Sequence, residues 1–313
     1  MHGKYALGGR GDSYYEYLLK LWLQTGKTNE VYKNRYLKAA HAILHNLISV
    51  TEEGLVFIDE IEATNRRTGK MDHLACFFPG VLALGWYHGL GRIVDGVAPV
   101  TLNLNGEEKG LLRTLQTNLH TFRKVSKVDY VSYCVFHEYQ YIGFDHLDIA
   151  KLLTKTCVIS YRDTATGLSP EIFRLLTGPI GSGQAETNIY GEKKHITMAI
   201  SERDAFSLLR PETVESLYIM WMVTNDEQYR IWGWDIFQAF RKYARDPATG
   251  AYCGVNNVRN ASPENARKDE TESFFLAETL KYLYLLFEDP TLFPLDSLVI
   301  NTEAHPFEIF TKN

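Results

Sequence analysis

Apolar residues recur at three- and four-residue spacing along most of this chain, which is the period of an amphipathic helix. Residues 12–23 show this period clearly, with Asp12 placed to act as an N-cap and Gly26 placed to end the helix. The same period predicts six further helices, at residues 30–47, 72–84, 147–161, 211–223, 227–243 and 270–286. The chain is thus a series of helical pairs joined by polar loops.

Extended segments are few and do not alternate with the helices. Residues 55–58 and 298–302 have strand character. Because a strand–helix alternation is missing, the pattern argues against a doubly wound sheet. We predict an all-α fold whose helical hairpins stack side by side or close into a toroid around a pocket, with short β elements in the loops. Residues 91–144 lack a clear amphipathic stripe and break this pattern.

The bulk composition excludes some classes of function. The formal net charge of −5 over 313 residues offers no basic surface for nucleic acid. The chain has no run of about 18 apolar residues, and residues 1–10 lack the pattern of a signal peptide. The 19 Tyr, 16 Phe and 5 Trp could stack on sugars, but a large helical core explains them better. Four cysteines permit one disulfide bridge and contain no CxxC zinc motif.

Several carboxylates fall at the starts of helices rather than on solvated faces. Pro211 suits a first helical position, so Glu212 and Glu215 lie three residues apart on the first turn. The helix dipole stabilises anions there, and Arg210 can pair with either glutamate. Favourable charge placement with a local ion pair explains this motif somewhat better than catalysis does, so the motif is not decisive alone.

Further candidate residues lie at comparable places. They are Asp12 at the start of the first helix, Asp72 and His73 at the start of another, Glu171 after a proline turn, Phe274 and Glu278 four residues apart on one helix face, and Thr302 and Glu303 near the end of the chain. A cap explains Asp12, and a structural pair explains Asp72 with His73. Together, however, the set supplies an acid, a base and an aromatic platform, as glycosidic bond hydrolysis requires. Its oxygen atoms also suit Ca²⁺.

Six strings of the sequence resemble class I α-1,2-mannosidases, glycoside hydrolase family 47. They are residues 10–20, 71–80, 167–172, 209–216, 272–286 and 301–306, which follow the family's order and cover most of the chain outside residues 91–144. The resemblance implies a barrel of seven helical hairpins, (α/α)7, incomplete here, with Ca²⁺ at the bottom of its pocket. It also implies cleavage of α-1,2-linked mannose from high-mannose N-glycans with inversion, in the lumen of the endoplasmic reticulum or Golgi.

The resemblance carries roles to the matching residues. Asp12 and Glu212 are similar to two of three catalytic carboxylates, with Glu212 as the base that activates water. Thr302 resembles the one direct protein ligand of Ca²⁺. The residues implied to act on the metal through water are Glu171, Glu215, Glu278 and Glu303. Those implied to bind the sugar are Arg10, Asp72, His73, Arg210, Phe274 and Glu278.

Two further features follow from the resemblance. Cys76 and Cys157 match the family's disulfide pair, which implies an oxidising compartment. Arg10, just before Asp12, is similar to the endoplasmic-reticulum type of the family, whereas Golgi-type members carry a smaller apolar residue at that position.

The sequence also departs from the family's pattern. The family's catalytic domain begins roughly a third earlier, so the first catalytic glutamate, the initial hairpins and the membrane anchor are expected in a preceding part. Residues 1–313 are interpreted as a single partial catalytic domain, in which residues 91–144 are an unmatched insertion, either a loop or a retained intron. Missing hairpins would expose apolar helix faces at about 25 cal/mol per Å², so we expect the chain alone to be unstable or weakly active.

Two other functions remain open on the same residues. A mannose-binding factor of endoplasmic-reticulum-associated degradation, with low or no activity, is consistent with the lack of the first glutamate. An inactive fragment with no independent role is the third hypothesis. The complete set of matched site residues, together with Arg10, favours the enzyme.

Overall fold

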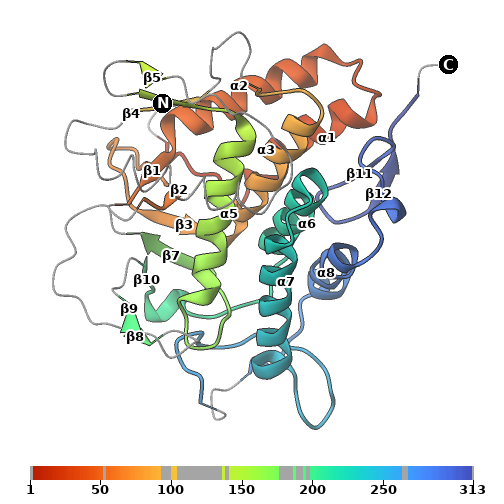
Figure 1. The fold of residues 1–313 in the computed structure, drawn as a ribbon. Helices are drawn as coiled ribbons and strands as arrows, with labels where there is room; N and C mark the ends of the chain where they lie inside the picture. The colour runs from red at the N-terminus through yellow and green to blue at the C-terminus, as the bar shows by residue number, and fades with distance from the viewer. Residues whose placement is uncertain are drawn as a thin grey trace.

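The computed structural model describes residues 3–51, 54–92, 100–103, 136–137, 141–175, 186–187, 193–194, 198–262 and 267–311, and most of the regular structure is helical (Figure 1). The α-helices are α1 Asp12–Gln24, α2 Glu30–Asn46, α3 Phe78–Tyr87, α5 His146–Arg162, α6 Glu212–Thr224, α7 Gln228–Ala239 and α8 Leu280–Phe287. The short 3₁₀ and π segments are η1 His73–Phe77, η2 Glu202–Asp204, η3 Phe240–Ala244, η4 Phe275–Thr279 and η5 Pro290–Leu292. The prediction of a helix-rich chain is confirmed.

Every helix predicted from the periodicity is present, but some begin at other residues. Gly11 is the N-cap of α1 and Asp12 is its first helical residue, so the predicted Asp12 cap is wrong. Glycine is tolerated at this position, which leaves the Asp12 carboxylate free of a capping role. The helix predicted from residue 72 becomes α-helical only at Phe78, where Pro79 suits the first turn. Residues 270–272 are not helical.

The strands are short and lie in five small antiparallel sheets within the described ranges. These sheets are β1 Ile48–Val50 with β2 Val56–Ile58, β3 Lys70–Asp72 with β7 Ile172–Leu175 and β10 Met198–Ala199, β4 Val100–Asn103 with β6 Tyr141–Phe144 and β5 Phe136–His137, β8 Glu186–Thr187 with β9 Lys193–Lys194, and β11 Leu298–Ile300 with β12 Pro306–Glu308. The β3–β7 ladder pairs Asp72 with Ile172. It therefore brings His73 beside Glu171, and the His73 N–H donates to the Glu171 carbonyl oxygen at 2.9 Å.

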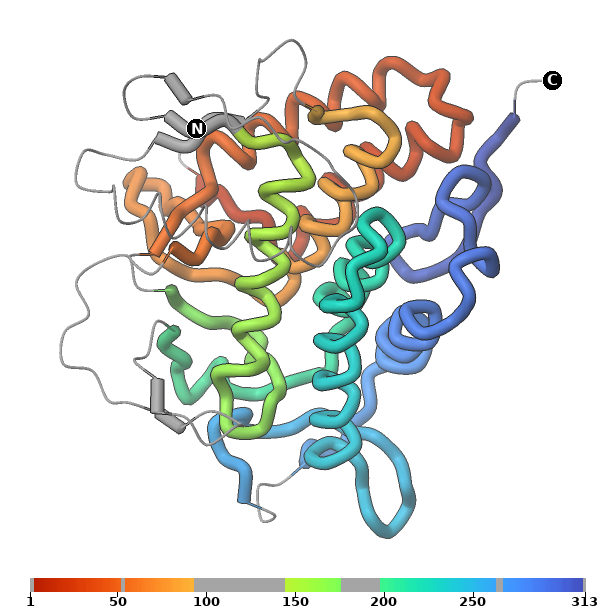
Figure 2. The backbone as a smooth tube through the Cα atoms, in the orientation of Figure 1, coloured from red at the N-terminus to blue at the C-terminus, as the bar shows by residue number. Residues whose placement is uncertain are grey.

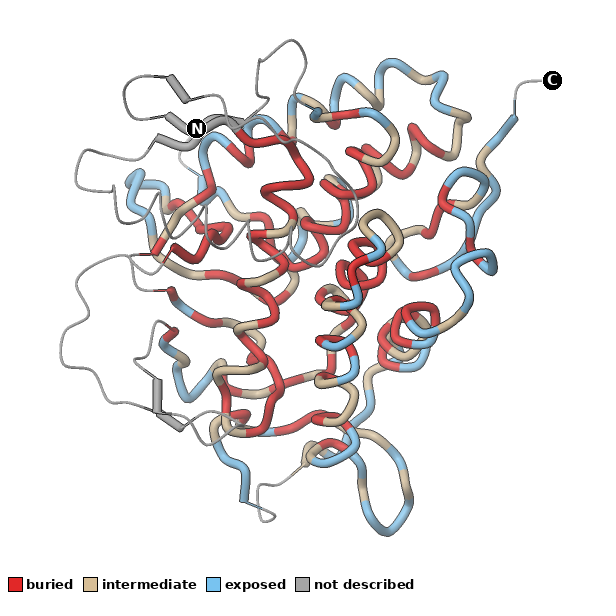
Figure 3. Tube along the Cα trace, in the orientation of Figure 1, coloured by how far each residue is buried: buried red, intermediate tan, exposed pale blue. Residues whose placement is uncertain are grey.

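The core is centred on α3, which is buried from Phe78 to Trp86 and packs against both α5 and α6 (Figures 1 and 3). A helix that is apolar all round requires such an environment. α3 approaches α6 closely at Gly80, because the Gly80 N–H donates to Ser216 Oγ at 2.9 Å and a Cβ there would lie 3.1 Å from Ser216 Cα. Ser216 Oγ also donates to the Cys76 carbonyl oxygen at 2.5 Å. The first turn of α6 is thereby fixed against η1.

The path of the chain separates its two ends. Figure 2 traces it from α1 and α2, through α3 and α5, to α6, α7 and α8.

α2 and α5, with 17 residues each, are the longest α-helices that the structure describes. A bilayer core requires about 20 apolar residues in one helix. Within the described part of the chain, no helix combines the length and the apolar character needed to cross a membrane.

The predicted insertion at residues 91–144 falls largely outside the described residues, so it stays a prediction. Its two ends, however, are in contact. The His146 N–H donates to the Gly91 carbonyl oxygen at 2.9 Å. Gly91 has a φ of +67°, and a Cβ on it would lie 2.1 Å from the His146 ring. The chain therefore leaves the core beyond α3 and returns to the same point at α5.

Buried histidines make the stability of this core depend on pH. Burial, and after it the positive charge of His41, lower the pKa of His146 to about 4. In the unfolded chain a histidine has a pKa of about 6.5, so the unfolded state binds more protons between these values. We therefore expect stability to fall as the pH drops from about 6.5 to 4, by up to about 3 kcal/mol from this residue.

Urea unfolding at several pH values tests this expectation. His146→Gln should flatten the pH dependence, while part of it persists because burial also lowers the pKa of His88 to about 4. His45→Gln, which changes an exposed histidine of α2, is the matched control and should leave the slope unchanged. An unaltered slope in His146→Gln would contradict the prediction.

Candidate active site

Residues from distant parts of the chain line one cavity of about 170 Å³. The lining residues are Asp12, Ser13, Glu16, Leu74, Phe77, Pro211, Glu212, Glu215, Phe274, Glu278, Thr302 and Glu303. Seven of the residues predicted from the sequence are therefore brought together, namely Asp12, Glu212, Glu215, Phe274, Glu278, Thr302 and Glu303. Among the described residues, the lining contains six carboxylates and neither a basic residue nor a histidine. The cavity is thus strongly acidic with an aromatic wall.

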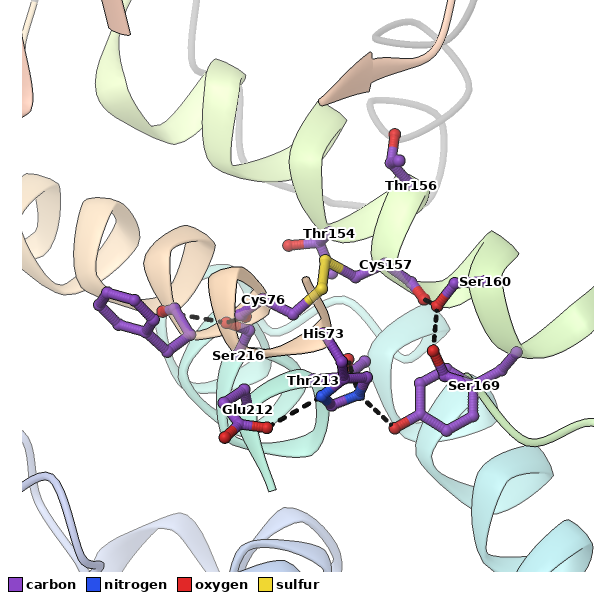
Figure 4. The surroundings of a disulfide bond; sticks show 12 residues. His73, Cys76, Thr154, Thr156, Cys157, Ser160, Ser169, Glu212, Thr213 and Ser216 are labelled. Atoms are coloured by element: carbon purple, nitrogen blue, oxygen red, sulfur yellow. Dashed lines mark hydrogen bonds and ion pairs between the residues drawn. A yellow bond between two sulfur atoms is a disulfide. The ribbon is translucent and has the colours of Figure 1, made fainter. Parts of the chain in front are cut away.

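The first turn of α6 supplies two of these carboxylates, Glu212 and Glu215, as the three-residue spacing predicted. Glu212 Oε2 lies 2.9 Å from His73 Nδ1 (Figure 4). On its other side, His73 Nε2 lies 2.7 Å from the Tyr161 hydroxyl and 3.0 Å from Thr213 Oγ1. His73 therefore connects the carboxylate of Glu212 to two hydroxyl groups in the core.

The contacts of His73 select one arrangement of its protons. Burial raises the pKa of Tyr161 far above its ordinary value, so its phenol remains protonated and can donate to Nε2. We infer that Nδ1 carries the ring proton and donates it to Glu212. This contact fixes the orientation of the Glu212 carboxyl group, although His73 itself does not line the cavity.

The predicted disulfide between Cys76 and Cys157 is confirmed, and it supports this arm of the site (Figure 4). Cys76 lies in η1, three residues after His73. Cys157 lies on α5, four residues before Tyr161 and therefore on the same helix face. The bond consequently ties together the two segments whose side chains hold Glu212 in place.

The sequence predicts that Arg210 pairs with Glu212 or Glu215, and this prediction is wrong. Arg210 forms an ion pair with Glu171, whose other carboxylate oxygen accepts the Leu208 N–H at 3.0 Å. The partner differs because Glu171, which directly precedes β7, lies beside the loop before α6 that contains Arg210. The guanidinium also lies 5.2 Å from the centre of the Phe274 ring, a cation–π distance. Arg210 and Glu171 are not among the residues that line the cavity, and Arg210 contacts the cavity wall through Phe274.

Two further predicted sugar-binding residues also lie outside the lining. Arg10 is exposed and has a positive φ of 79°. Asp72 pairs with Lys70 at 2.5 Å, and the loop before α1 passes so closely that a Cβ on Gly8 would lie 2.1 Å from an Asp72 oxygen. Of the predicted substrate-binding group, only Phe274 and Glu278 face the cavity directly.

Thr302 is presented by a rigid turn between β11 and β12. The Asn301 side-chain oxygen accepts the His305 N–H at 2.8 Å, and the Asn301 N–H donates to the His305 carbonyl oxygen at 2.9 Å. Lys281 of α8 donates to the Ala304 carbonyl oxygen at 2.8 Å. Because these bonds fix the backbone on both sides of Thr302, its position in the cavity is fixed as well.

Sequence reasoning missed Glu16 and Lys20, which are both buried on α1. Lys20 forms ion pairs with Glu16 and with Glu215, the latter at 3.0 Å. Burial lowers the pKa of Lys20, but the two carboxylates outweigh it and raise that pKa above its ordinary value. The sequence does contain a pattern that indicates Glu16 and Lys20 as site residues. Asp12, Glu16 and Lys20 are spaced by four residues and therefore share one face of a largely apolar helix.

Like charges accumulate in the cavity. Burial, and after it the negative charges of Glu215, Glu212 and Glu303, raise the pKa of Glu278 to about 7. Burial, and then the charge of Glu215, raise the pKa of Glu16 as well. A bound cation would relieve this repulsion, since an opposite charge favours the ionised carboxylate.

The donor set fits a hard cation. The polar side chains of the lining are carboxylates and hydroxyls, and oxygen ligands are those that Ca²⁺ prefers. Among the described residues, no three acidic, histidine or cysteine side chains are close enough to hold a metal ion by themselves. The hydroxyl of Thr302 and the carboxylates of the lining are nevertheless oxygen donors of the kind that fits a hard cation such as Ca²⁺.

The chain is similar to known proteins in sequence and in fold. Residues 1–309 match the profile of glycosyl hydrolase family 47. Over 310 residues the chain is 39% identical to the endoplasmic reticulum mannosyl-oligosaccharide 1,2-alpha-mannosidase of Mus musculus, and over 311 residues it is 35% identical to the protein of that name in Schizosaccharomyces pombe. The fold resembles the solved alpha-1,2-mannosidase from Trichoderma reesei, with a TM-score of 0.68 and 25% identity.

These similarities cover nearly all of this chain but only part of each relative. The two sequence matches cover 98% of this chain, which spans 37% of the mouse protein and 50% of the S. pombe protein. The structural match covers 99% of this chain and 54% of the T. reesei chain. Since the family profile extends over almost the whole sequence, this chain belongs to glycosyl hydrolase family 47.

Proposed function

We propose that this chain acts in an inverting, Ca²⁺-dependent α-1,2-mannosidase that trims high-mannose N-glycans. One observation carries the proposal: Asp12, Glu212 and Thr302, from three separate parts of the chain, line one acidic cavity with the ring of Phe274. The names of the similar proteins from mouse and S. pombe, both mannosyl-oligosaccharide mannosidases, support the same substrate class.

Glu212 is the proposed base. In an inverting glycosidase one carboxylate removes a proton from the attacking water while another acidic group acts at the opposite side of the sugar. The contact with His73 keeps the Glu212 carboxyl group oriented toward the cavity, at 2.9 Å from Nδ1. Asp12 is the proposed second catalytic carboxylate on the same lining.

Thr302 is the proposed direct ligand of Ca²⁺, with Glu215, Glu278 and Glu303 acting through water. All four line the cavity. When bound, the ion would supply a positive charge that orients sugar hydroxyls and water. Glu171 was predicted to act on the metal too, but its pairing with Arg210 supports a positioning role instead.

The sugar is proposed to pack on the Phe274 ring, beside Glu278. Arg210 and His73 are proposed to act indirectly. Arg210 contacts the Phe274 ring, and His73 contacts the Glu212 carboxylate. Arg10 and Asp72, at the loop before α1, are proposed to contact the substrate outside the cavity lining. The Arg10 position supports the endoplasmic-reticulum type, whose lumen also suits the disulfide.

The proposed architecture is an (α/α)7 barrel, of which residues 1–313 form part of a single catalytic domain. The helix-rich fold and the similarity to the T. reesei enzyme support it. The contact of Gly91 with His146 supports residues 91–144 as an insertion between α3 and α5.

An assay of the full-length protein, incubated with a nine-mannose N-glycan, tests the function. With Ca²⁺ present we expect release of a single mannose, detected by mass spectrometry, with β-mannose as the first anomer seen by NMR because inversion converts α to β. A chelator should abolish release, and added Ca²⁺ should restore it. Mannose binding without any release would favour the alternative, a binding factor of endoplasmic-reticulum-associated degradation. Release that persists under chelation would contradict the role of the metal.

A further inference from the structure

A single buried lysine lies behind the acidic cavity. The Lys20 side chain is 6% exposed, and its Nζ contacts carboxylates from two helices, Glu16 of α1 and Glu215 of α6. Its Nζ also donates to the Asn301 carbonyl oxygen at 3.2 Å. One ammonium group therefore connects α1, α6 and the turn that presents Thr302.

Lys20 acts on the cavity through its neighbours rather than by direct contact. Glu16, Glu215 and Thr302 line the cavity, whereas Lys20 does not. Below it lies a small apolar space shared with Tyr282, whose hydroxyl donates to the same Glu215 oxygen at 3.1 Å. The ammonium is consequently separated from any bound sugar by the carboxylates that it contacts.

The charge of Lys20 therefore contributes to the electrostatic potential of the cavity. In the part of the chain that the structure describes, the lining has six carboxylates and no positive side chain, and Lys20 contacts two of those carboxylates. Salt and water screen a buried charge much less than an exposed one. Because Coulomb repulsion grows with the charge of the ion, such an ammonium disfavours a trivalent cation more than a divalent one.

We propose that Lys20 sets the charge selectivity of the metal site, offsetting part of its negative charge so that the cavity matches a divalent rather than a trivalent ion. The inference rests on the Ca²⁺ site of the proposed function. A purely structural role is the competing explanation, since Lys20 also holds the Asn301 backbone. Loss of a structural contact would weaken Ca²⁺ and a trivalent lanthanide alike, whereas loss of the charge would change their ratio.

Calorimetric titration of the chain with Ca²⁺ and, separately, with Tb³⁺ distinguishes the two. Lys20→Gln removes the charge and keeps hydrogen-bond donors, Lys20→Met removes both, and Lys20→Arg keeps the charge. We expect both neutral variants to raise the affinity for Tb³⁺ relative to Ca²⁺ about tenfold, or about 1.4 kcal/mol. Lys20→Arg should stay within about twofold of the wild type.

Lys281→Met is the matched control. It removes another lysine that donates to the same turn, at Ala304, but Lys281 is only half-buried and its charge is screened by solvent. Its Tb³⁺ to Ca²⁺ ratio should remain that of the wild type. A structural role would make Lys281→Met and Lys20→Met behave alike.

The outcomes separate this inference from the proposed function. A wild-type chain that binds neither ion would overturn the Ca²⁺ site itself. Wild-type binding with an unchanged ratio in Lys20→Gln would overturn only the role of Lys20. If both neutral variants fail to fold while Lys20→Arg folds, the lysine serves the fold and the inference is likewise overturned.

Discussion

Glu212→Gln should lower the rate of mannose release about 1000-fold while leaving sugar and Ca²⁺ binding within about threefold of the wild type. A general base contributes about 10²- to 10⁴-fold to the rate, and an amide cannot accept the proton of the attacking water. Glutamine retains an oxygen for the His73 Nδ1–H contact, so the cavity should keep its shape. Single-turnover release measured by mass spectrometry, with calorimetry for binding, separates the two effects.

Glu227→Gln is the matched control, because Glu227 also stands at the start of a helix, as the N-cap of α7, but is exposed and does not line the cavity. It should retain the wild-type rate within about twofold. A loss of less than tenfold in Glu212→Gln would contradict its assignment as the base. A loss caused by weaker sugar binding would assign Glu212 to binding instead.

Replacing both disulfide cysteines, Cys76→Ala with Cys157→Ala, should lower the free energy of unfolding by about 4 kcal/mol. The bond closes a loop with a sequence separation of 81 residues, and such a loop restricts the unfolded chain strongly. Both side chains are fully buried, so the loss also removes packing between η1 and α5. Urea or thermal unfolding of the two forms measures the difference.

The same variant should affect the site as well as the stability. Because the bond joins the segments that carry His73 and Tyr161, the Glu212 carboxyl group should lose part of its fixed orientation. Cys253→Ala, at a half-buried cysteine that forms no disulfide, is the control and should cost less than about 1 kcal/mol. A double variant no less stable than Cys253→Ala would show that the bond does not stabilise the fold.

The charged groups around the cavity influence one another. Burial, and after it the negative charges of Glu215, Glu212 and Glu303, raises the pKa of Glu278 to about 7. A bound cation would offset this repulsion, because an opposite charge favours the ionised carboxylate. Among the described residues, Lys20 is a buried cation that already contacts two of the lining carboxylates, Glu16 and Glu215.

The helices and most members of the site could be predicted from the amino-acid sequence alone. The period of 3.6 residues is a local property, so α1, α2, α5, α6 and α7 could be predicted within a few residues. The spacing of Glu212 with Glu215 and of Phe274 with Glu278 placed each pair on one face, and both pairs line the cavity. The resemblance to the family supplied Thr302 and the disulfide pair, which no spacing rule would give.

The pairing of the buried charges, in contrast, depends on the packing of distant segments. Arg210 pairs with Glu171 rather than with its neighbour Glu212, because β3 and β7 carry a distant carboxylate to it. Lys20 and Glu215 are 195 residues apart in sequence, and nothing local to either predicts their contact. Helix formation depends on neighbours a few residues away, whereas the partner of a buried charge depends on which remote segment packs against it.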